Sequence, residues 1–190
     1  NISLKKYGLF FGPETSTSNR CNIGGMVGNN ACGSHSVIYG STRDHTIEIN
    51  TILSDGSEAL FGPIGKSEFR DKCLQNSLEG SIYRKMNEIL CDKHNQNEIR
   101  EGFPDPGIPR RNTGYALDLM LDNEIFQEYS TRKFNLCKLL AGSEGTLAVI
   151  TEVKLNLVKL PPPAKALVCI HLEKRNDAFL ANLIALKYNP

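Results

Sequence analysis

The chain has 190 residues, of which 40% are hydrophobic and 23% charged, a composition typical of a globular protein with a buried core. Its 22 basic and 21 acidic residues give a formal net charge of +1 without a basic stripe, which argues against nucleic acid as a partner. At this length we expect one compact domain together with part of a second.

Six cysteines are scattered along the chain, with no C-x-x-C pair and no histidine at zinc-finger spacing: Cys21, Cys32, Cys73, Cys91, Cys137 and Cys169. This pattern favours reduced thiols in a cytoplasmic protein and predicts no metal site. No stretch approaches the ~18 apolar residues that a membrane-spanning helix needs, and the start does not read as a signal peptide. Because the chain begins at Asn1 and stops at Pro190 after an amphipathic segment, we expect it to be part of a longer protein.

The stretch from residue 12 to residue 33 is rich in glycine and small hydroxyl side chains and has almost no large apolar ones. Pro13 fixes one backbone angle, and the glycines leave room for close approach of the backbone to a ligand. The hydroxyls are those of Thr15, Ser16, Thr17 and Ser18, and the glycines include Gly24, Gly25 and Gly28. Uncovered backbone N–H groups and hydroxyls suit a phosphate. Taken alone, the glycines are also consistent with simple turns.

Regular elements follow this loop. A short helix is predicted over residues 24–31, with Asn22 as its N-cap and its positive end toward the loop. Apolar residues indicate a strand over residues 46–53, and Asp55-Gly56 supplies a hairpin turn to a return strand over residues 58–61. This pattern predicts antiparallel pairing.

The second half of the chain contains a helix, a break and a strand. Apolar residues at helical spacing predict a helix over residues 77–91. Prolines and glycines exclude regular structure over residues 102–109. Alternation predicts a long strand over residues 146–157. One face of this strand holds Leu147, Val149, Thr151, Val153, Leu155 and Leu157, and the other holds Glu152, Lys154 and Asn156.

Consecutive prolines at residues 161–163 are stiff and extended, so they separate structural elements. Beyond them, the pattern predicts a strand over residues 166–172 and a helix over residues 176–188, which is too little for a complete domain. We therefore predict a domain boundary at the prolines, between residues 1–160 and residues 161–190.

Several motifs occur in order along the chain. They are the loop with Pro13 and the I-G-G step at residues 23–25, Y-G-x-x-R-D-H at 39–45, the D-G turn at 55–56, N-T-G-Y at 112–115 and G-S-E-G-T-L-A-V-I-T at 142–151. Together they resemble the FAD-linked oxidase family of the vanillyl-alcohol oxidase and p-cresol methylhydroxylase superfamily. Within it, the chain is similar in particular to D-lactate, glycolate and D-2-hydroxyglutarate dehydrogenases. The similarity covers most of residues 7–160.

The resemblance implies an α+β fold with a mixed, largely antiparallel sheet flanked by helices, the second subdomain of a PCMH-type FAD-binding domain. Residues 1–160 would form the C-terminal half of that domain, and residues 161–190 would start a truncated cap over the substrate. A first FAD subdomain would precede Asn1, and the rest of the cap would follow Pro190.

The activity implied by the resemblance is oxidation of a 2-hydroxy acid, of the D-lactate, glycolate or D-2-hydroxyglutarate type, by hydride transfer to FAD. Some relatives are fused to an iron–sulfur module that accepts the electrons, and the implied location is cytoplasmic or peripheral to the inner membrane. The chain alone is expected to be inactive and to bind FAD weakly or not at all. The alternative is that the isolated chain is a cofactor-free structural or interaction module of a larger flavoprotein.

Carried over to this sequence, the cofactor contacts of the family fall on the opening loop, the short helix and the second glycine-rich run. They are Pro13, Glu14, Thr15, Ser16, Thr17, Asn22, Ile23, Gly24, Gly25, Asn30, Gly33, Glu144, Gly145, Val149 and Ile150. Relatives often have aspartate and a second proline where this chain has Glu14 and Thr15. We expect the backbone of Glu14 to contact the cofactor and its carboxylate to cap a turn. Glu144 has an alternative role as the cap of the following turn. No catalytic residue and no metal ligand is assigned.

Two arginines are candidates for substrate binding. Arg110 and Arg111 have the planar fork that suits a carboxylate, and they are equally suited to pair with Asp105 and Asp118.

Two histidines are weak candidates for a functional role. His35 lies in the flavin-side loop, either near the flavin or on the surface, and we favour the surface. His45 follows Asp44, but adjacent side chains on a strand point to opposite faces, so it is given no catalytic role.

Overall fold

A computed structural model describes residues 1–108, 111, 114–164 and 166–188. The chain divides into two compact units, Asn1–Leu160 and Pro161–Pro190, and each is described by itself. The division falls at the run of prolines. The assignment of these units to a FAD-binding subdomain and a cap stays a prediction.

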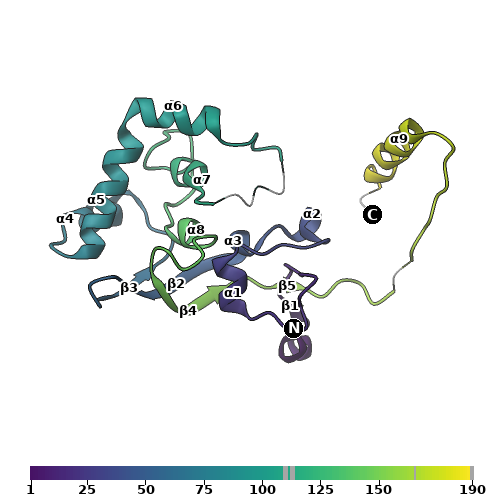
Figure 1. Cartoon of the computed structure of the whole chain (residues 1–190), viewed down its shortest axis with the longest axis horizontal. Coiled ribbons are helices and arrows are strands. Elements are labelled where there is room, and N and C mark those ends of the chain that lie inside the picture. Colours follow the sequence, from purple (N-terminus) through teal and green to yellow (C-terminus); the bar gives the residue numbers. More distant parts are fainter. Residues whose placement is uncertain (109–110, 112–113, 165, 189–190) are drawn as a thin grey trace. The chain divides into compact units, whose positions relative to one another are not determined.

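An antiparallel sheet in the order β3-β2-β4 forms the base of the first unit (Figure 1). It consists of β2 (Thr46–Ile52), β3 (Glu58–Phe61) and β4 (Val149–Leu155). The predicted hairpin is confirmed, because β2 pairs antiparallel with β3 across the turn that contains Gly56. Two short strands, β1 (Leu9–Phe10) and β5 (Val158–Lys159), pair separately. The predicted α+β class with a largely antiparallel sheet is confirmed.

A β-bulge in β4 changes the predicted alternation. Asn50 of β2 pairs with Glu152, but the next residue, Thr51, pairs with Ile150, so Thr151 is an extra residue. Ile150 and Val153 therefore both pack against the main core. The predicted apolar face is correct from Val153 onward and wrong before the bulge, where Val149 is 63% exposed.

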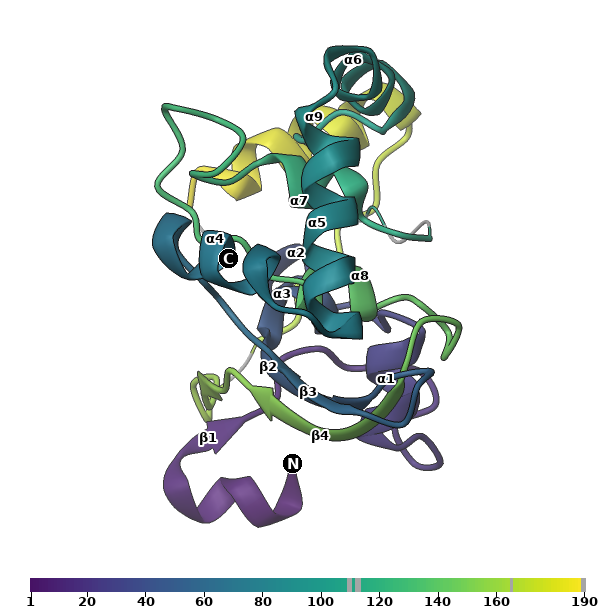
Figure 2. The same cartoon turned by 90° about the vertical axis from the view of Figure 1, so that its left-hand side faces the viewer.

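Helices cover one side of this sheet. They are α4 (Lys66–Leu74), α5 (Leu78–Cys91), α6 (Lys93–Gly102), α7 (Leu117–Leu121) and α8 (Cys137–Leu140), and the two views show them together (Figures 1 and 2). The predicted helix over residues 77–91 is confirmed as α5, which Ser77 caps by accepting a hydrogen bond from the backbone N–H of Gly80. The helices α4 and α6 were not among the predicted elements. Residues 103–108 are irregular, as their prolines predict.

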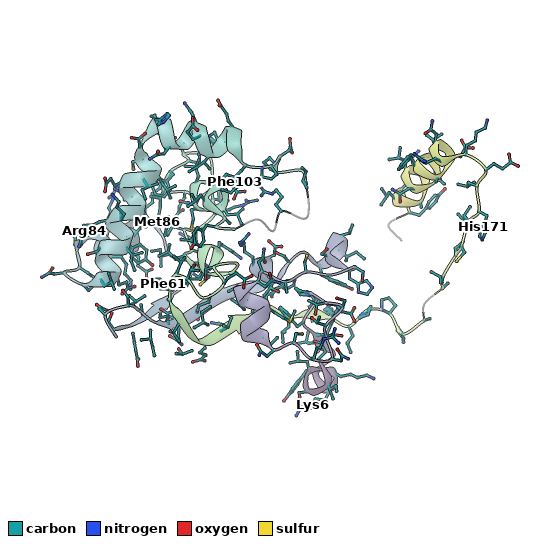
Figure 3. All side chains as sticks on the ribbon, viewed as in Figure 1. Lys6, Phe61, Arg84, Met86, Phe103 and His171 are labelled. Atoms are coloured by element: carbon teal, nitrogen blue, oxygen red, sulfur yellow. The ribbon has the colours of Figure 1, made fainter. Side chains whose placement is uncertain are left out.

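The main core lies between these helices and the sheet. Phe134 is fully buried, and its ring stands edge-on to Phe69 with 4.9 Å between centroids. Phe61 of β3 and Met86 of α5 lie in the same core (Figure 3). Such a cluster provides a rigid scaffold for the loops at its edge.

A second, smaller core supports the opening loop. Phe11, Met26 and Ala31 are buried together, with Leu155 and Leu157 packed against them. The elements here are short: η1 (Ile2–Tyr7), α1 (Ile23–Gly28), α2 (Ser36–Tyr39) and α3 (Thr42–His45). The predicted helix over residues 24–31 is confirmed as α1, but it ends at Gly28.

The described residues of the second unit include the helix α9 (Arg175–Leu186), which confirms the prediction for residues 176–188. The strand predicted over residues 166–172 is wrong, since these residues form no strand. A strand needs a partner for its backbone hydrogen bonds, and none pairs with this segment within the described part of the unit. No disulfide joins the described cysteines, and no described helix combines the length and apolarity needed to cross a membrane.

Candidate cofactor site

The loop from Glu14 to Gly33 begins and ends at one place. A Cβ added at Gly33 would lie 1.3 Å from the carbonyl oxygen of Glu14, so only glycine allows the two segments to come this close. Beside this contact, Glu14 Oε2 lies 2.7 Å from Nδ1 of His35. The expectation that the Glu14 carboxylate caps a turn is therefore wrong. His35 is exposed at the surface.

Hollows surround the start of this loop. One of about 430 Å³ is lined by Thr15, Ser16, Thr17, Gly25, Asn30 and Cys32, among others. A second, of about 560 Å³, shares Thr15 and Ser16 with the first and extends to Gly33 and His35. A third, of about 530 Å³, is lined by Pro13, Glu14, Asn22 and Ile23 and also includes Thr15. All the cofactor contacts predicted in residues 13–33 except Gly24 thus line at least one of these depressions, which share lining residues.

The hydroxyl-rich segment forms a self-supporting turn. The N–H of Ser18 donates to the carbonyl of Thr15 at 3.0 Å, and the N–H of Cys21 donates to that of Thr17 at 2.9 Å. The hydroxyls of Thr15 and Thr17 lie 3.1 Å apart. Because the turn satisfies these backbone groups itself, its hydroxyls are presented to the hollow in a fixed arrangement.

The helix α1 presents a face without side chains. Asn22 caps it, with Oδ1 accepting from the N–H of Gly25 at 2.7 Å. A Cβ added at Gly24 would meet only Asn22 Oδ1 at 3.6 Å, which is ordinary contact, so the fold itself leaves room for a larger residue. A glycine in a helix costs about 0.5–1 kcal/mol relative to alanine. Glycines that the fold does not require are expected where a ligand approaches the backbone.

The turn after Gly142 meets the end of α1. The N–H of Glu144 donates to the carbonyl of Gly28 at 3.0 Å, and both Glu144 and Gly145 have positive φ, 52° and 75°. These two predicted contacts therefore lie next to the loop, with Glu144 exposed. The hydroxyl of Ser143 is buried and has no hydrogen-bond partner in the described part of the chain. Sequence reasoning did not single out Ser143, although it stands within the G-S-E-G-T run.

Two predicted contacts lie farther along the same segment. Val149 and Ile150 are on β4, which is an edge strand of the sheet formed by the described residues. The side chain of Ile150 packs on the main core, and neither residue lines the three hollows. Any contact of theirs with a ligand would come from the exposed edge or from the side chain of Val149.

Of the two proposed substrate arginines, Arg111 lines none of the three hollows of this loop. Arg110 lies outside the described residues, as do Asn112 and Thr113 of the N-T-G-Y motif. Arg111 pairs with Asp118, one of the two partners considered for it, and lines a separate hollow. Its role in substrate binding stays a prediction.

His45 is held by the backbone on both sides. Its Nε2 lies 2.6 Å from the carbonyl oxygen of Tyr39, and its Nδ1 lies 3.1 Å from that of Asn156. Asp44 belongs to a helical turn rather than a strand and accepts hydrogen bonds from Ser41. No group of three His, Cys, Asp or Glu side chains able to hold a metal ion occurs among the residues that the structure describes.

These features fit a cofactor with a phosphate chain and a flat ring. The bare face of α1 would admit a ring or phosphate close to the backbone, the hydroxyl turn offers donors and acceptors, and the buried hydroxyl of Ser143 has hydrogen-bonding capacity left. No carboxylate other than Glu14 lines the three hollows, as far as the described residues show. The donor set thus suits an anionic cofactor.

Comparisons with known proteins agree with this geometry. Residues 1–59 match the FAD binding domain family. The chain is 37% identical over 161 residues to a D-2-hydroxyglutarate dehydrogenase of Pseudomonas putida, covering 85% of this chain and 15% of the relative. It is 36% identical to the enzyme of the same name from Escherichia coli, with the same coverage. It is 27% identical over 173 residues to a mitochondrial D-lactate dehydrogenase [cytochrome] of Arabidopsis thaliana, covering 89% of this chain and 18% of the relative.

The chain spans about 15% of the length of its first curated relatives. Its match to a FAD binding domain covers the loop, α1, β2 and the turn that follows β2, and the relatives extend the similarity over most of the chain. Over the segment that it spans, the chain is similar to these dehydrogenases, and its residues 1–59 match a FAD binding domain.

Proposed function

We propose that this chain forms one wall of the FAD site in a flavin-dependent oxidoreductase that oxidises a 2-hydroxy acid. The family match and the names of the relatives support this activity. The observation that carries the proposal is the bare face of α1, where Gly24 has space for a side chain and lacks one.

The residues of the loop would bind and position the cofactor. The turn at Thr15–Thr17 offers hydroxyls, α1 admits the cofactor at Gly24 and Gly25, and the backbone of Glu144 and Gly145 lies at the other end of the helix. Asn30 lines the 430 Å³ hollow, and Gly33 lines the 560 Å³ hollow. Held by these residues, the flavin would supply the hydride acceptor for oxidation of the substrate carbon. The contribution of these residues is to hold the ring in place and to exclude water from one of its sides.

The substrate class follows from the relatives, whose names include D-2-hydroxyglutarate and D-lactate dehydrogenases. We propose a 2-hydroxy acid of the D-lactate, glycolate or D-2-hydroxyglutarate type. Arg111 is a candidate for binding its carboxylate only where Asp118 releases the guanidinium. A first FAD subdomain, a cap and an iron–sulfur electron acceptor are proposed as further parts of the whole protein, which would be cytoplasmic or attached at the inner membrane.

Flavin binding tests the proposal. We expect the intact protein to retain FAD, seen as absorbance near 450 nm, and to bleach on anaerobic addition of at least one member of a panel of D- and L-2-hydroxy acids. We expect the 190-residue chain alone to quench FAD fluorescence weakly, with a dissociation constant above about 1 μM, which corresponds to about −8.2 kcal/mol. An intact protein that neither retains nor binds FAD would refute the proposal and favour a cofactor-free structural module.

A further inference from the structure

Arg43 is a buried cation at the back of the candidate site. It is 3% exposed, and its guanidinium donates to backbone carbonyls of two distant segments. Nε and Nη2 donate to Ala141 at 2.9 and 2.6 Å, and Nη2 also donates to Gly114 at 2.9 Å. A planar fork is suited to bind two carbonyls at once in this way.

The same residue reaches the wall of the hollow through its backbone. Its N–H donates to Oδ1 of Asn30 at 2.8 Å, and Asn30 lines the 430 Å³ hollow. The preceding residue, Thr42, fixes the next position of that wall, because its N–H and hydroxyl both donate to the carbonyl of Ala31, at 3.0 and 2.7 Å. Residues 30 and 31 are thus held from behind by residues 42 and 43.

The segments that meet at Arg43 are conformationally unusual. Asn30 has φ 47°, Gly114 has φ 53° and Gly142 has φ 96°. A Cβ added at Gly142 would lie 2.4 Å from Nη2 of Arg43 and 3.3 Å from Cβ of Asn30, so these three residues are in close contact. Positive φ at a residue such as Asn30 costs free energy and persists only where the surroundings enforce it.

The charge of Arg43 has no ion-pair partner among the described residues. Burial lowers the pKa of its guanidinium, against the opposing effect of the charges of Asp118 and Asp44. Asp118 pairs with Arg111, and Asp44 accepts hydrogen bonds from Ser41. Among the described residues the guanidinium donates to backbone carbonyls alone. Burying a cation without an ion-pair partner costs free energy, which indicates that the geometry of its fork is needed.

We propose that Arg43 is a positioning residue of the cofactor site: it holds the wall at Asn30–Ala31 and the turn at Ala141–Gly142 in the shape that receives the cofactor before it binds. This inference rests on the proposed FAD site for its ligand, while the positioning itself is a property of the chain. Arg43 itself is not proposed to contact the cofactor. It acts through Asn30 and through the turn that carries Glu144.

The test compares Arg43→Lys with Arg84→Lys in the intact protein. Arg84 is a matched control, because it also donates to two backbone carbonyls, those of Cys73 and Gln75, but it lies on the outer side of α5 (Figure 3). Hydrogen exchange of peptides covering residues 26–33 and 141–146 is measured without FAD, and FAD affinity is measured by fluorescence. A third variant, Arg43→Ala, is measured with and without millimolar guanidinium.

For Arg43→Lys we expect at least tenfold faster exchange in both peptides, unchanged exchange in α5 and at least tenfold weaker FAD binding. Guanidinium should restore part of the affinity to Arg43→Ala, and Arg84→Lys should bind FAD like the wild type. Unchanged exchange and affinity in Arg43→Lys would overturn the proposal. So would equally fast exchange in α5, or global unfolding of that variant, since Arg43 would then serve general stability. A wild type that binds no FAD would refute the proposed function, while the exchange of the peptides would still decide the role of Arg43.

Discussion

Replacing Gly24 with alanine should move stability and cofactor affinity in opposite directions. The added Cβ would meet only Asn22 Oδ1 at 3.6 Å, so it causes no clash within the chain. Alanine is favoured over glycine in a helix by about 0.5–1 kcal/mol. For a chain of this size, that gain should raise Tm by about 1–4 °C.

The same methyl group would stand on the bare face of α1, where the cofactor is proposed to approach. We expect the FAD dissociation constant of the intact protein to rise at least tenfold, which is about 1.4 kcal/mol. Gly24→Val should extend the effect and abolish retained flavin while leaving cooperative unfolding. Calorimetry of the apoprotein and fluorescence titration with FAD give the two quantities separately.

Two other glycines, one outside the site and one within it, serve as comparisons for this reasoning. Gly56 has φ 83° in the turn between β2 and β3, outside α1 and outside the loop of residues 14–33, so Gly56→Ala should destabilise the protein through backbone strain without changing FAD affinity. Gly33→Ala should destabilise it more, because the Cβ would overlap the carbonyl of Glu14. A Gly24→Ala protein that binds FAD as tightly as the wild type, or that loses stability, would refute the argument that the glycine serves a ligand rather than the fold.

Three further predictions concern the scaffold. Phe134→Ala should lower the free energy of unfolding by about 3–5 kcal/mol in urea titrations, because it empties the centre of the aromatic core; a loss below about 1 kcal/mol would contradict that placement. A double-mutant cycle of Arg111→Gln and Asp118→Asn should give a coupling energy of about 1 kcal/mol, since both side chains are 19% exposed, and a coupling near zero would show that the pair does not hold in solution. Burial raises the pKa of the Cys137 thiol to about 12 from 9.0, so the folded state retains this proton longer than the unfolded chain does. The corresponding stability is present below pH 9 and is lost as the pH rises toward 12, by up to about 1.4 kcal/mol per pH unit, and the slope should decrease in Cys137→Ala.

The elements that the sequence predicted well carry their own local signals. The β2–β3 hairpin has an Asp-Gly turn between alternating strands, and α5 has an apolar stripe and a serine cap. The missed helices lack such a stripe, since Phe69 is the single fully buried residue of α4 and α6 buries only Gln96 and Ile99. Their position depends on packing against α5, which no local pattern reveals.

The sequence predicts the part of the site that a single loop forms, and it does not predict the parts that depend on contacts between distant segments. The glycines and hydroxyls of residues 13–33 are close in sequence, so their grouping around the hollows follows from the loop itself. The bulge at Thr151 altered which β4 side chains face the core, because register depends on the partner strand. Arg43 was visible within the Y-G-x-x-R-D-H motif, but its partners lie 71 and 98 residues away, and no spacing rule connects them.

The contact between Gly33 and the carbonyl of Glu14 has a consequence for the thermodynamics of binding. Bringing the two ends of a flexible segment of this length together costs roughly 2.7 kcal/mol of conformational entropy, from (3/2)RT ln n with n of about 20. Here the chain itself meets that cost on folding, because the two ends are already in contact. Binding of a cofactor in the loop would therefore not have to offset the cost of closing it. The measured binding free energy would then come mainly from the contacts between the cofactor and the loop.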